Sequence, residues 1–345
     1  MEESFLKQAL ALAEEQGRLR QLKTIDSQRE IHFSKEGKDY INFSSNDYLG
    51  LSQHLSLKTA SINAIQEWGN GSTASRLVSG HLNLHQLLED SLCRWKGSEA
   101  ALSFNSGYQA NTGIIPSLLG KQDLVFADRL IHASLIDGIS LSQARLLRYK
   151  HNDEDDLEKL LQRHADKDGQ KIIVSESIFS MDGDFANLER LCQLAEQYNC
   201  LLYIDDAHGS GISGEQGRGP CAEYIDRIDI IVGTFGKALG SFGAYALCSK
   251  TMKDYLINFC RSFIYSTALP PSVVANNRAA IELLMTQEGQ VIVDRLQRNI
   301  SYFKTRLQEL GFDTPGKGSA IFPLIIGDEQ KTLDLSAKLF NKGIF

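Results

Sequence analysis

Short apolar runs alternate with amphipathic stretches from residue 100 to residue 248, and this alternation restricts the fold more than any other feature. The expected strands cover 100–104, 123–127, 145–149, 171–177, 201–205, 228–234 and 243–248. The stretches between them have helical spacing, which predicts helices at 106–115, 134–143, 154–165 and 188–199. This pattern predicts an α/β fold with a mainly parallel central sheet flanked by helices, and ligands bind such sheets at the carboxyl ends of the strands.

The flanking regions predict further elements and a division into three domains. Outside the alternation we expect helices at 3–24, 84–96 and 333–340, strands at 40–43 and 321–326, and helices across 251–311 that break at Pro270 and Pro271. A glycine before two apolar residues at 343–345 predicts a helix cap and the entry to a further strand. The predicted domains are an N-terminal helical arm with a short strand (1–45), a large domain (46–275) and a small C-terminal α/β domain (276–345) that we expect to be incomplete.

Composition and charge argue against several classes of protein. The 345 residues are 42% hydrophobic and 23% charged, as in an ordinary soluble protein, and no apolar run reaches the length of about eighteen residues that predicts a membrane span. The net charge of -7 and the lack of a basic stripe argue against a nucleic-acid partner. Six cysteines without a CxxC pair, and an N-terminus without a secretory signal, predict a cytoplasmic protein with reduced cysteines.

Lys237 follows an apolar run, on a turn between Gly236 and Gly240. The glycines let the backbone bend and let another group approach closely. A lysine at the end of a strand in an α/β chain is a candidate Schiff-base amine. The alternative is a solvated loop lysine, and this stretch alone favours that alternative because most lysines are exposed.

Asp205 ends an apolar strand, and His208 follows it on the next loop. A buried carboxylate needs a cation, and a protonated pyridine nitrogen is one. At a separation of about 4 Å and an effective dielectric near 20, such a pair is worth on the order of 4 kcal/mol. The alternative is an aspartate that only caps the following loop.

Three stretches resemble familiar binding motifs, but the neighbouring residues argue against each motif. The run GSGISG (209–214) matches GxGxxG, but GRGP (217–220) leaves no room for the helix that a dinucleotide site requires. A P-loop is excluded because Ala238 stands where serine or threonine is needed. His81 and His85 have the spacing of metal ligands, but the glutamate of HExxH and a third ligand are missing, so we predict no metal site.

Other polar positions could hold a phosphate or an aromatic ring. The run NSGY (105–108) lies between a strand and a helix, where free backbone N–H groups and the helix dipole favour an anion. Thr234 and Thr267 offer hydroxyl groups, although each could be an ordinary cap. His132, just past a strand, could stack on a heteroaromatic ring or only begin a helix.

Taken together, these stretches resemble the α-oxoamine synthases, which are pyridoxal-phosphate enzymes of the aspartate-aminotransferase fold (fold type I). The resemblance covers essentially the whole chain. The matching motifs, in order, are NFSSNDYLGL (42–51), GSTASRLVSG (71–80), SGYQAN (106–111), HAS (132–134), FSMDGD (179–184), DDAHG (205–209), TFGKALG (234–240) and YSTALPP (265–271).

The resemblance implies a role for each matched position. Lys237 would form the Schiff base with pyridoxal 5'-phosphate and move protons, while Asp205 would pair with the pyridinium nitrogen. His132 would stack on the ring and also contact the substrate. The other implied cofactor-binding residues are Ser106, Gly107, Tyr108, Ser180, His208, Thr234 and Thr267.

The resemblance also implies substrates and a homodimer. Thr267 would reach the phosphate of the neighbouring subunit, so the active sites would be shared, and Arg20 and Asn46 would contact substrate. Phe235 in TFGK favours the branch that serves biotin synthesis, in which L-alanine condenses with pimeloyl-CoA or pimeloyl-acyl carrier protein. Two alternatives stay open: a sister enzyme that uses glycine with acetyl-CoA or succinyl-CoA, and a cofactor-binding protein with little turnover.

The sequence departs from the family pattern in two places. Thr73 occupies a position that is usually glycine. The family's further C-terminal region, with an arginine that binds the amino-acid carboxylate and a substrate-contacting threonine, has no counterpart before Phe345. We therefore expect either a fragment or compromised turnover.

Overall fold

The computed structural model describes residues 3–29, 31–312, 314 and 318–345. These residues form two compact units, Asn46–Pro323 and a smaller unit made of Met1–Ser45 with Leu324–Phe345. The division into residues 1–45, 46–275 and 276–345 stays a prediction. Residues 276–323, predicted to begin a small C-terminal domain, group with the larger unit.

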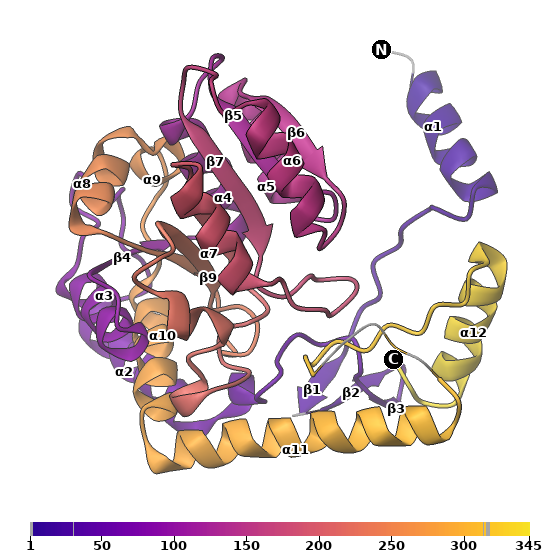
Figure 1. Cartoon of the computed structure of the whole chain (residues 1–345). Helices are drawn as coiled ribbons and strands as arrows, with labels where there is room; N and C mark the ends of the chain where they lie inside the picture. The colour runs from indigo at the N-terminus through magenta and orange to yellow at the C-terminus, as the bar shows by residue number, and fades with distance from the viewer. Residues whose placement is uncertain (1–2, 30, 313, 315–317) are drawn as a thin grey trace. The chain divides into compact units, whose positions relative to one another are not determined.

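The larger unit is built on a seven-stranded sheet (Figure 1). Its strands are β4 (Ala100–Phe104), β5 (Leu124–Asp128), β6 (Arg145–Tyr149), β7 (Lys171–Glu176), β8 (Leu201–Asp205), β9 (Ile230–Thr234) and β10 (Ala244–Cys248). They lie in the order β4-β10-β9-β8-β7-β5-β6, and β10 runs in the opposite direction to the other six strands. The predicted mainly parallel sheet is confirmed.

Helices cover both faces of this sheet, because alternate side chains of each strand enter different hydrophobic clusters. Along β8, Leu202 and Ile204 lie in the cluster that includes α3, α6, α7 and α10, whereas Tyr203 lies in the cluster that includes α4, α5 and α8. The helices are α2 (Leu55–Trp68), α3 (Asn83–Lys96), α4 (Gly107–Leu118), α5 (Ala133–Ser142), α6 (Glu154–Arg163), α7 (Leu188–Gln197), α8 (Lys250–Phe259), α9 (Arg261–Ile264), α10 (Pro271–Leu284) and α11 (Gln287–Glu309). Among the described residues, no helix has the length and apolar character needed to cross a membrane.

The smaller unit contains an antiparallel three-stranded sheet and two helices. Its elements are α1 (Ser4–Glu15), β1 (Ser27–Arg29), β2 (His32–Lys35), β3 (Lys38–Ile41) and α12 (Glu329–Asn341). Ile344 forms a parallel bridge with Ile41, so the predicted strand entry after α12 is confirmed. Tyr40 stacks on Phe340 with ring centroids 4.5 Å apart, which joins the sheet to α12.

Several predicted elements differ from the structure. The helix predicted at 3–24 ends at Glu15, because Gly17 follows with a left-handed φ of 64° that terminates helices. The strand predicted at 321–326 is wrong: these residues have no regular structure, and Pro323 removes a backbone donor that a strand ladder needs. The helix break at 270–271 is confirmed, and further breaks separate α8, α9, α10 and α11.

Thr73 has a φ of 62°, in the left-handed region where a β-branched side chain is strained. This conformation is the physical reason for a glycine at that position. We expect Thr73→Gly to raise the free energy of unfolding by about 1 kcal/mol, because about 1–3 kcal/mol of strain outweighs the extra chain entropy of glycine. Urea denaturation measures the change.

The matched control for this prediction is Thr59→Gly, which places glycine at an exposed position inside α2. There we expect a loss of about 0.5–1 kcal/mol. A loss of stability at both positions would show that Thr73 is not strained.

Candidate active site

A cavity of about 230 Å³ opens at the carboxyl ends of the central strands, where the fold predicts a ligand site. The side chains that line it come from the ends of β7, β8 and β9 and from the starts of α4 and α5. The lining residues are Gly107, Tyr108, Asn111, His132, Ser134, Glu176, Asp205, Ala207, His208, Thr234 and Lys237.

Strand alternation sends the adjacent carboxylates of Asp205 and Asp206 to opposite faces of the sheet. Asp205 follows the direction of Tyr203 and reaches the cavity, where it is 6% exposed. Asp206 is fully buried on the other face, against the end of α3. One aspartate can therefore serve the cavity while the other anchors the loop.

Asp205 is held by donors on two sides. One carboxylate oxygen accepts from Nδ2 of Asn111 at 2.8 Å, and the other accepts from the backbone N–H of Ala207 at 3.0 Å. Nδ2 of Asn111 also donates to the Ser134 hydroxyl, which lies 2.8 Å from Nδ1 of His132. This chain of hydrogen bonds fixes Asp205 and His132 relative to one another.

Lys237 lies on the turn after β9, and the turn requires its glycine. Gly240 has a φ of 63°, and a Cβ there would lie 2.3 Å from the backbone nitrogen of Ser52. Burial lowers the pKa of Lys237, and the negative charges of Asp205 and Glu176 offset part of that shift. The amine makes no hydrogen bond within the described part of the chain, so it is available to react.

His208 is buried and bonded to a tyrosine that the sequence analysis did not single out. Its Nδ1 lies 2.8 Å from the Tyr48 hydroxyl, which donates to the side-chain oxygen of Asn46 at 3.2 Å. Burial, followed by the charges of Lys237 and His132, lowers the pKa of His208 to about 3. His208 is therefore neutral near pH 7, and Asn46 connects to the cavity through Tyr48.

The start of α4 forms a cradle at the rim of the cavity. Ser106 caps this helix by accepting from the backbone N–H of Gln109 at 3.1 Å. A Cβ at Gly107 would lie 2.9 Å from the methyl group of Thr234, so glycine alone permits this close approach. Backbone N–H groups at a helix start favour an anionic group such as a phosphate.

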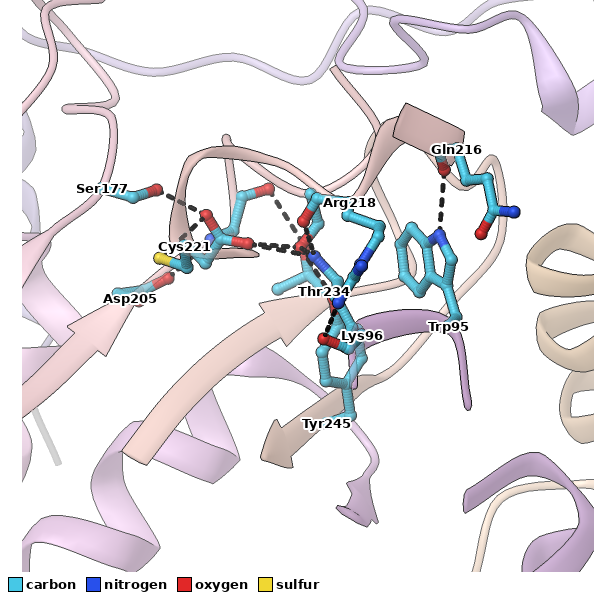
Figure 2. Close-up of polar contacts among 12 residues, drawn as sticks. Trp95, Lys96, Ser177, Asp205, Gln216, Arg218, Cys221, Thr234 and Tyr245 are labelled. Atoms are coloured by element: carbon cyan, nitrogen blue, oxygen red, sulfur yellow. Dashed lines mark hydrogen bonds and ion pairs between the residues drawn. The ribbon is translucent and has the colours of Figure 1, made fainter. Parts of the chain in front are cut away.

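A buried polar network joins the end of α3 to the segment that follows β8 (Figure 2). Nζ of Lys96 lies 2.9 Å from the Ser210 hydroxyl, 2.6 Å from the Arg218 carbonyl oxygen and 3.4 Å from Asp206. Asp206 also accepts from the Ser177 hydroxyl at 2.6 Å. The network ties α3 to the segment between β8 and β9, where no α-helix begins after the GSGISG run.

The structure brings most of the predicted site residues together. Seven line the cavity: Gly107, Tyr108, His132, Asp205, His208, Thr234 and Lys237. Ser106 precedes the lining residue Gly107, and Ser180, which does not line the cavity, donates a backbone hydrogen bond to Glu176, which does. Thr267 lines a separate small pocket, and Arg20 belongs to the smaller unit, so neither is placed at this cavity.

Sequence reasoning missed Asn111, Ser134 and Glu176. Glu176 ends β7 in the same way that Asp205 ends β8, and that parallel position was a usable signal. Asn111 lies one helical turn beyond Gly107, so it faces the same side of α4 as the helix start.

A larger groove of about 610 Å³ lies elsewhere on the same unit. Its lining includes Glu189, Glu215, Glu223 and Arg218 but neither a lysine amine nor a histidine. We therefore place the chemistry in the smaller cavity, which holds both.

The chain belongs to the family described as aminotransferase class I and II, whose model matches residues 38–345. Among its relatives, the 8-amino-7-oxononanoate synthase of Geobacter sulfurreducens is 48% identical over 333 residues, which cover 96% of this chain and 85% of the relative.

Solved structures agree with this placement. A serine palmitoyltransferase from S. paucimobilis, with a bound pyridoxal-phosphate–myriocin adduct, has a TM-score of 0.92 at 29% identity and covers 99% of this chain and 87% of its own. The 8-amino-7-oxononanoate synthase of Francisella tularensis has a TM-score of 0.76 at 32% identity, covering 89% of this chain and 87% of its own. The predicted fold type I architecture is confirmed.

The residues of the cavity fit pyridoxal phosphate on three observations. A largely buried amine, Lys237, has no hydrogen-bond partner among the described residues. A buried carboxylate, Asp205, faces the same cavity without an ion pair to a described residue. The helix start at Gly107 provides a cradle that a Cβ would fill.

Proposed function

We propose that the protein joins L-alanine to a pimeloyl thioester to give 8-amino-7-oxononanoate, CO₂ and the free thiol carrier, in biotin synthesis. The observation that carries this proposal is the agreement of relatives that are 46–48% identical over 95–100% of the chain and share the name 8-amino-7-oxononanoate synthase. In the reaction, a bond forms between Cα of alanine and the acyl carbon. The C–S bond of the thioester and the Cα–carboxylate bond break.

In this proposal each cavity residue has a separate role. Bound pyridoxal phosphate would withdraw electrons from Cα of the amino acid. The amine of Lys237 would hold the cofactor at rest, then take the proton from Cα and return it at the end, because its lowered pKa favours a neutral base. Asp205 would keep the ring nitrogen protonated, and His132 would cover the ring.

His208 and the start of α4 would orient the cofactor. A neutral His208 bonded to Tyr48 can offer one hydrogen bond without adding charge to the cavity. Gly107 and Thr234 would surround the phosphate, and Ser106 and Tyr108 would contact the cofactor at the same start of α4. Asn46, which lies beside Tyr48, is suited to contact the substrate.

We also propose that the protein is a cytoplasmic homodimer. Thr267 does not line the cavity of its own chain. Its carbonyl oxygen accepts from Nδ2 of Asn105, and its backbone forms a β-bridge with Ser75. A role at the site of a second copy is consistent with that position. Sedimentation equilibrium would test the dimer, and a monomer at all concentrations would contradict it.

A panel of amino acids and thioesters tests the reaction. Alanine, glycine and serine would each be offered with pimeloyl-CoA, pimeloyl-acyl carrier protein, acetyl-CoA, succinyl-CoA and palmitoyl-CoA. Released thiol and ¹⁴CO₂ from carboxyl-labelled amino acid would be measured. We expect the highest kcat/KM for alanine with a pimeloyl thioester, whereas preference for glycine with acetyl-CoA or succinyl-CoA would overturn the proposal. A cofactor spectrum without turnover would support a protein of little activity.

A further inference from the structure

Glu176 is a cavity residue to which neither the family resemblance nor the proposed reaction gives a role. It ends β7, is 2% exposed and lines the cavity. In the parallel register of β7 and β8, Glu176 stands directly opposite Asp205. Neighbouring strands lie about 4.8 Å apart, and both side chains follow the same face, so two carboxylates stand side by side.

The surroundings of Glu176 provide little positive charge. Its Oε1 accepts from the backbone N–H of His132 at 2.5 Å, and the backbone N–H of Ser180 also bonds to its carboxyl group. Among the residues that line the cavity, Lys237 is the one lysine, and its pKa is itself lowered by burial. The other titratable side chains that line the cavity are Tyr108, His132, Asp205 and His208.

Two adjacent buried carboxylates do not both ionise readily. Burial, followed by the charge of Asp205, raises the pKa of Glu176 to about 8. Asp205 accepts from the side-chain amide of Asn111 and from the backbone N–H of Ala207, whereas the donors to Glu176, among the residues that the structure describes, are backbone N–H groups alone. Carboxyl pairs that share one proton behave in this way in other enzymes.

We propose that Glu176 and Asp205 form a carboxyl pair that shares one proton, held on Glu176, so that the cavity presents a single negative charge to Lys237 and to the cofactor. Glu176 is thus a positioning residue for Asp205 and for His132, whose backbone it binds. The proposal rests on the cofactor of the proposed function and not on its substrates. Deprotonation of Glu176 would add a second negative charge and strengthen the hold of Lys237 on its own proton.

The first test needs no cofactor and no substrate. In protein that carries [δ-¹³C]glutamate, we expect one carboxyl resonance to titrate near pH 8 and to be missing in Glu176→Gln. Glutamine keeps a side-chain oxygen for the His132 N–H. Glu223→Gln, at an exposed position, is the control and should retain that resonance. If the resonance lost in Glu176→Gln instead titrates below pH 6, the proposal is overturned.

The second test removes the partner carboxylate. In Asp205→Asn, the midpoint for Glu176 should fall by one pH unit or more, which is a tenfold change in its proton affinity. An unchanged midpoint would show that the two carboxyl groups are not coupled.

The third test measures the absorbance of the bound cofactor. We compare the pH titration of absorbance for wild-type protein and Glu176→Gln, both loaded with pyridoxal phosphate. The wild-type midpoint should be about one pH unit higher, because only the wild type gains a second negative charge, on Glu176, beside that of Asp205. Equal midpoints would show that the charge of Glu176 does not change how strongly Lys237 holds its proton. Failure of the substrate panel would leave all three tests intact, so the two proposals can fail separately.

Discussion

Lys237→Ala is expected to lower turnover by at least about 10³-fold, since the variant loses both the amine that holds the cofactor and the base at Cα. Borohydride reduction of the wild type should fix the cofactor to a peptide that contains residue 237, and the variant should yield no such peptide. Peptide mass spectrometry and steady-state kinetics measure the two losses. The effect is large because the amine has no substitute among the residues that line the cavity.

Lys250→Ala is the matched control for this prediction. Lys250 is exposed at the start of α8 and is not among the residues that line the cavity, so both the adduct and turnover should persist. Removal of the Lys237 amine should not unfold the protein, because that amine makes no hydrogen bond to any residue that the structure describes. An adduct that persists in Lys237→Ala would assign the Schiff base to another lysine and overturn the site.

Most strands of the larger sheet were predictable because they are buried on both faces. Such strands read as nearly continuous apolar runs, and the observed bounds of β4 and β8 equal the predicted ones. By contrast, β1 is three exposed residues, β2 buries only Phe33, and α2 buries only Leu57 and Ala64. These segments therefore lack the apolar pattern from which a strand or a helix is predicted. The antiparallel direction of β10 depends on tertiary pairing, which no local run of residues encodes.

The candidate site was predictable where function restricts the residue type at a turn. Lys237, Asp205 and Gly107 stand where a lysine, a carboxylate and a glycine are chemically required, and the structure brings all three to one cavity. Asn111 and Glu176 were missed, because an asparagine inside a helix and a glutamate at a strand end have many ordinary explanations. Only the register of β7 against β8 shows that Glu176 meets Asp205.

Lys96→Met is expected to lower the free energy of unfolding by about 3–5 kcal/mol, because it leaves the fully buried carboxylate of Asp206 without its cation. The lysine side chain is 3% exposed, and its Nζ bonds to Ser210 and to the Arg218 carbonyl oxygen as well (Figure 2). Burial lowers the pKa of Lys96, and the charge of Asp206 opposes that shift. Urea denaturation measures the loss, and Lys250→Met, at an exposed position, should change stability by no more than about 0.5 kcal/mol.

The double variant Lys96→Met/Asp206→Asn separates the cost of an unpaired charge from the loss of packing. If the cost comes from the uncompensated carboxylate, its removal should recover most of the stability, since a buried ion pair replaced as a whole is often nearly neutral. Asparagine can still accept from the Ser177 hydroxyl, so the loop after β8 should keep its position and Asp205 should still reach the cavity. A double variant no more stable than Lys96→Met would show that the lysine acts through its contacts with Ser210 and Arg218 and not through its charge.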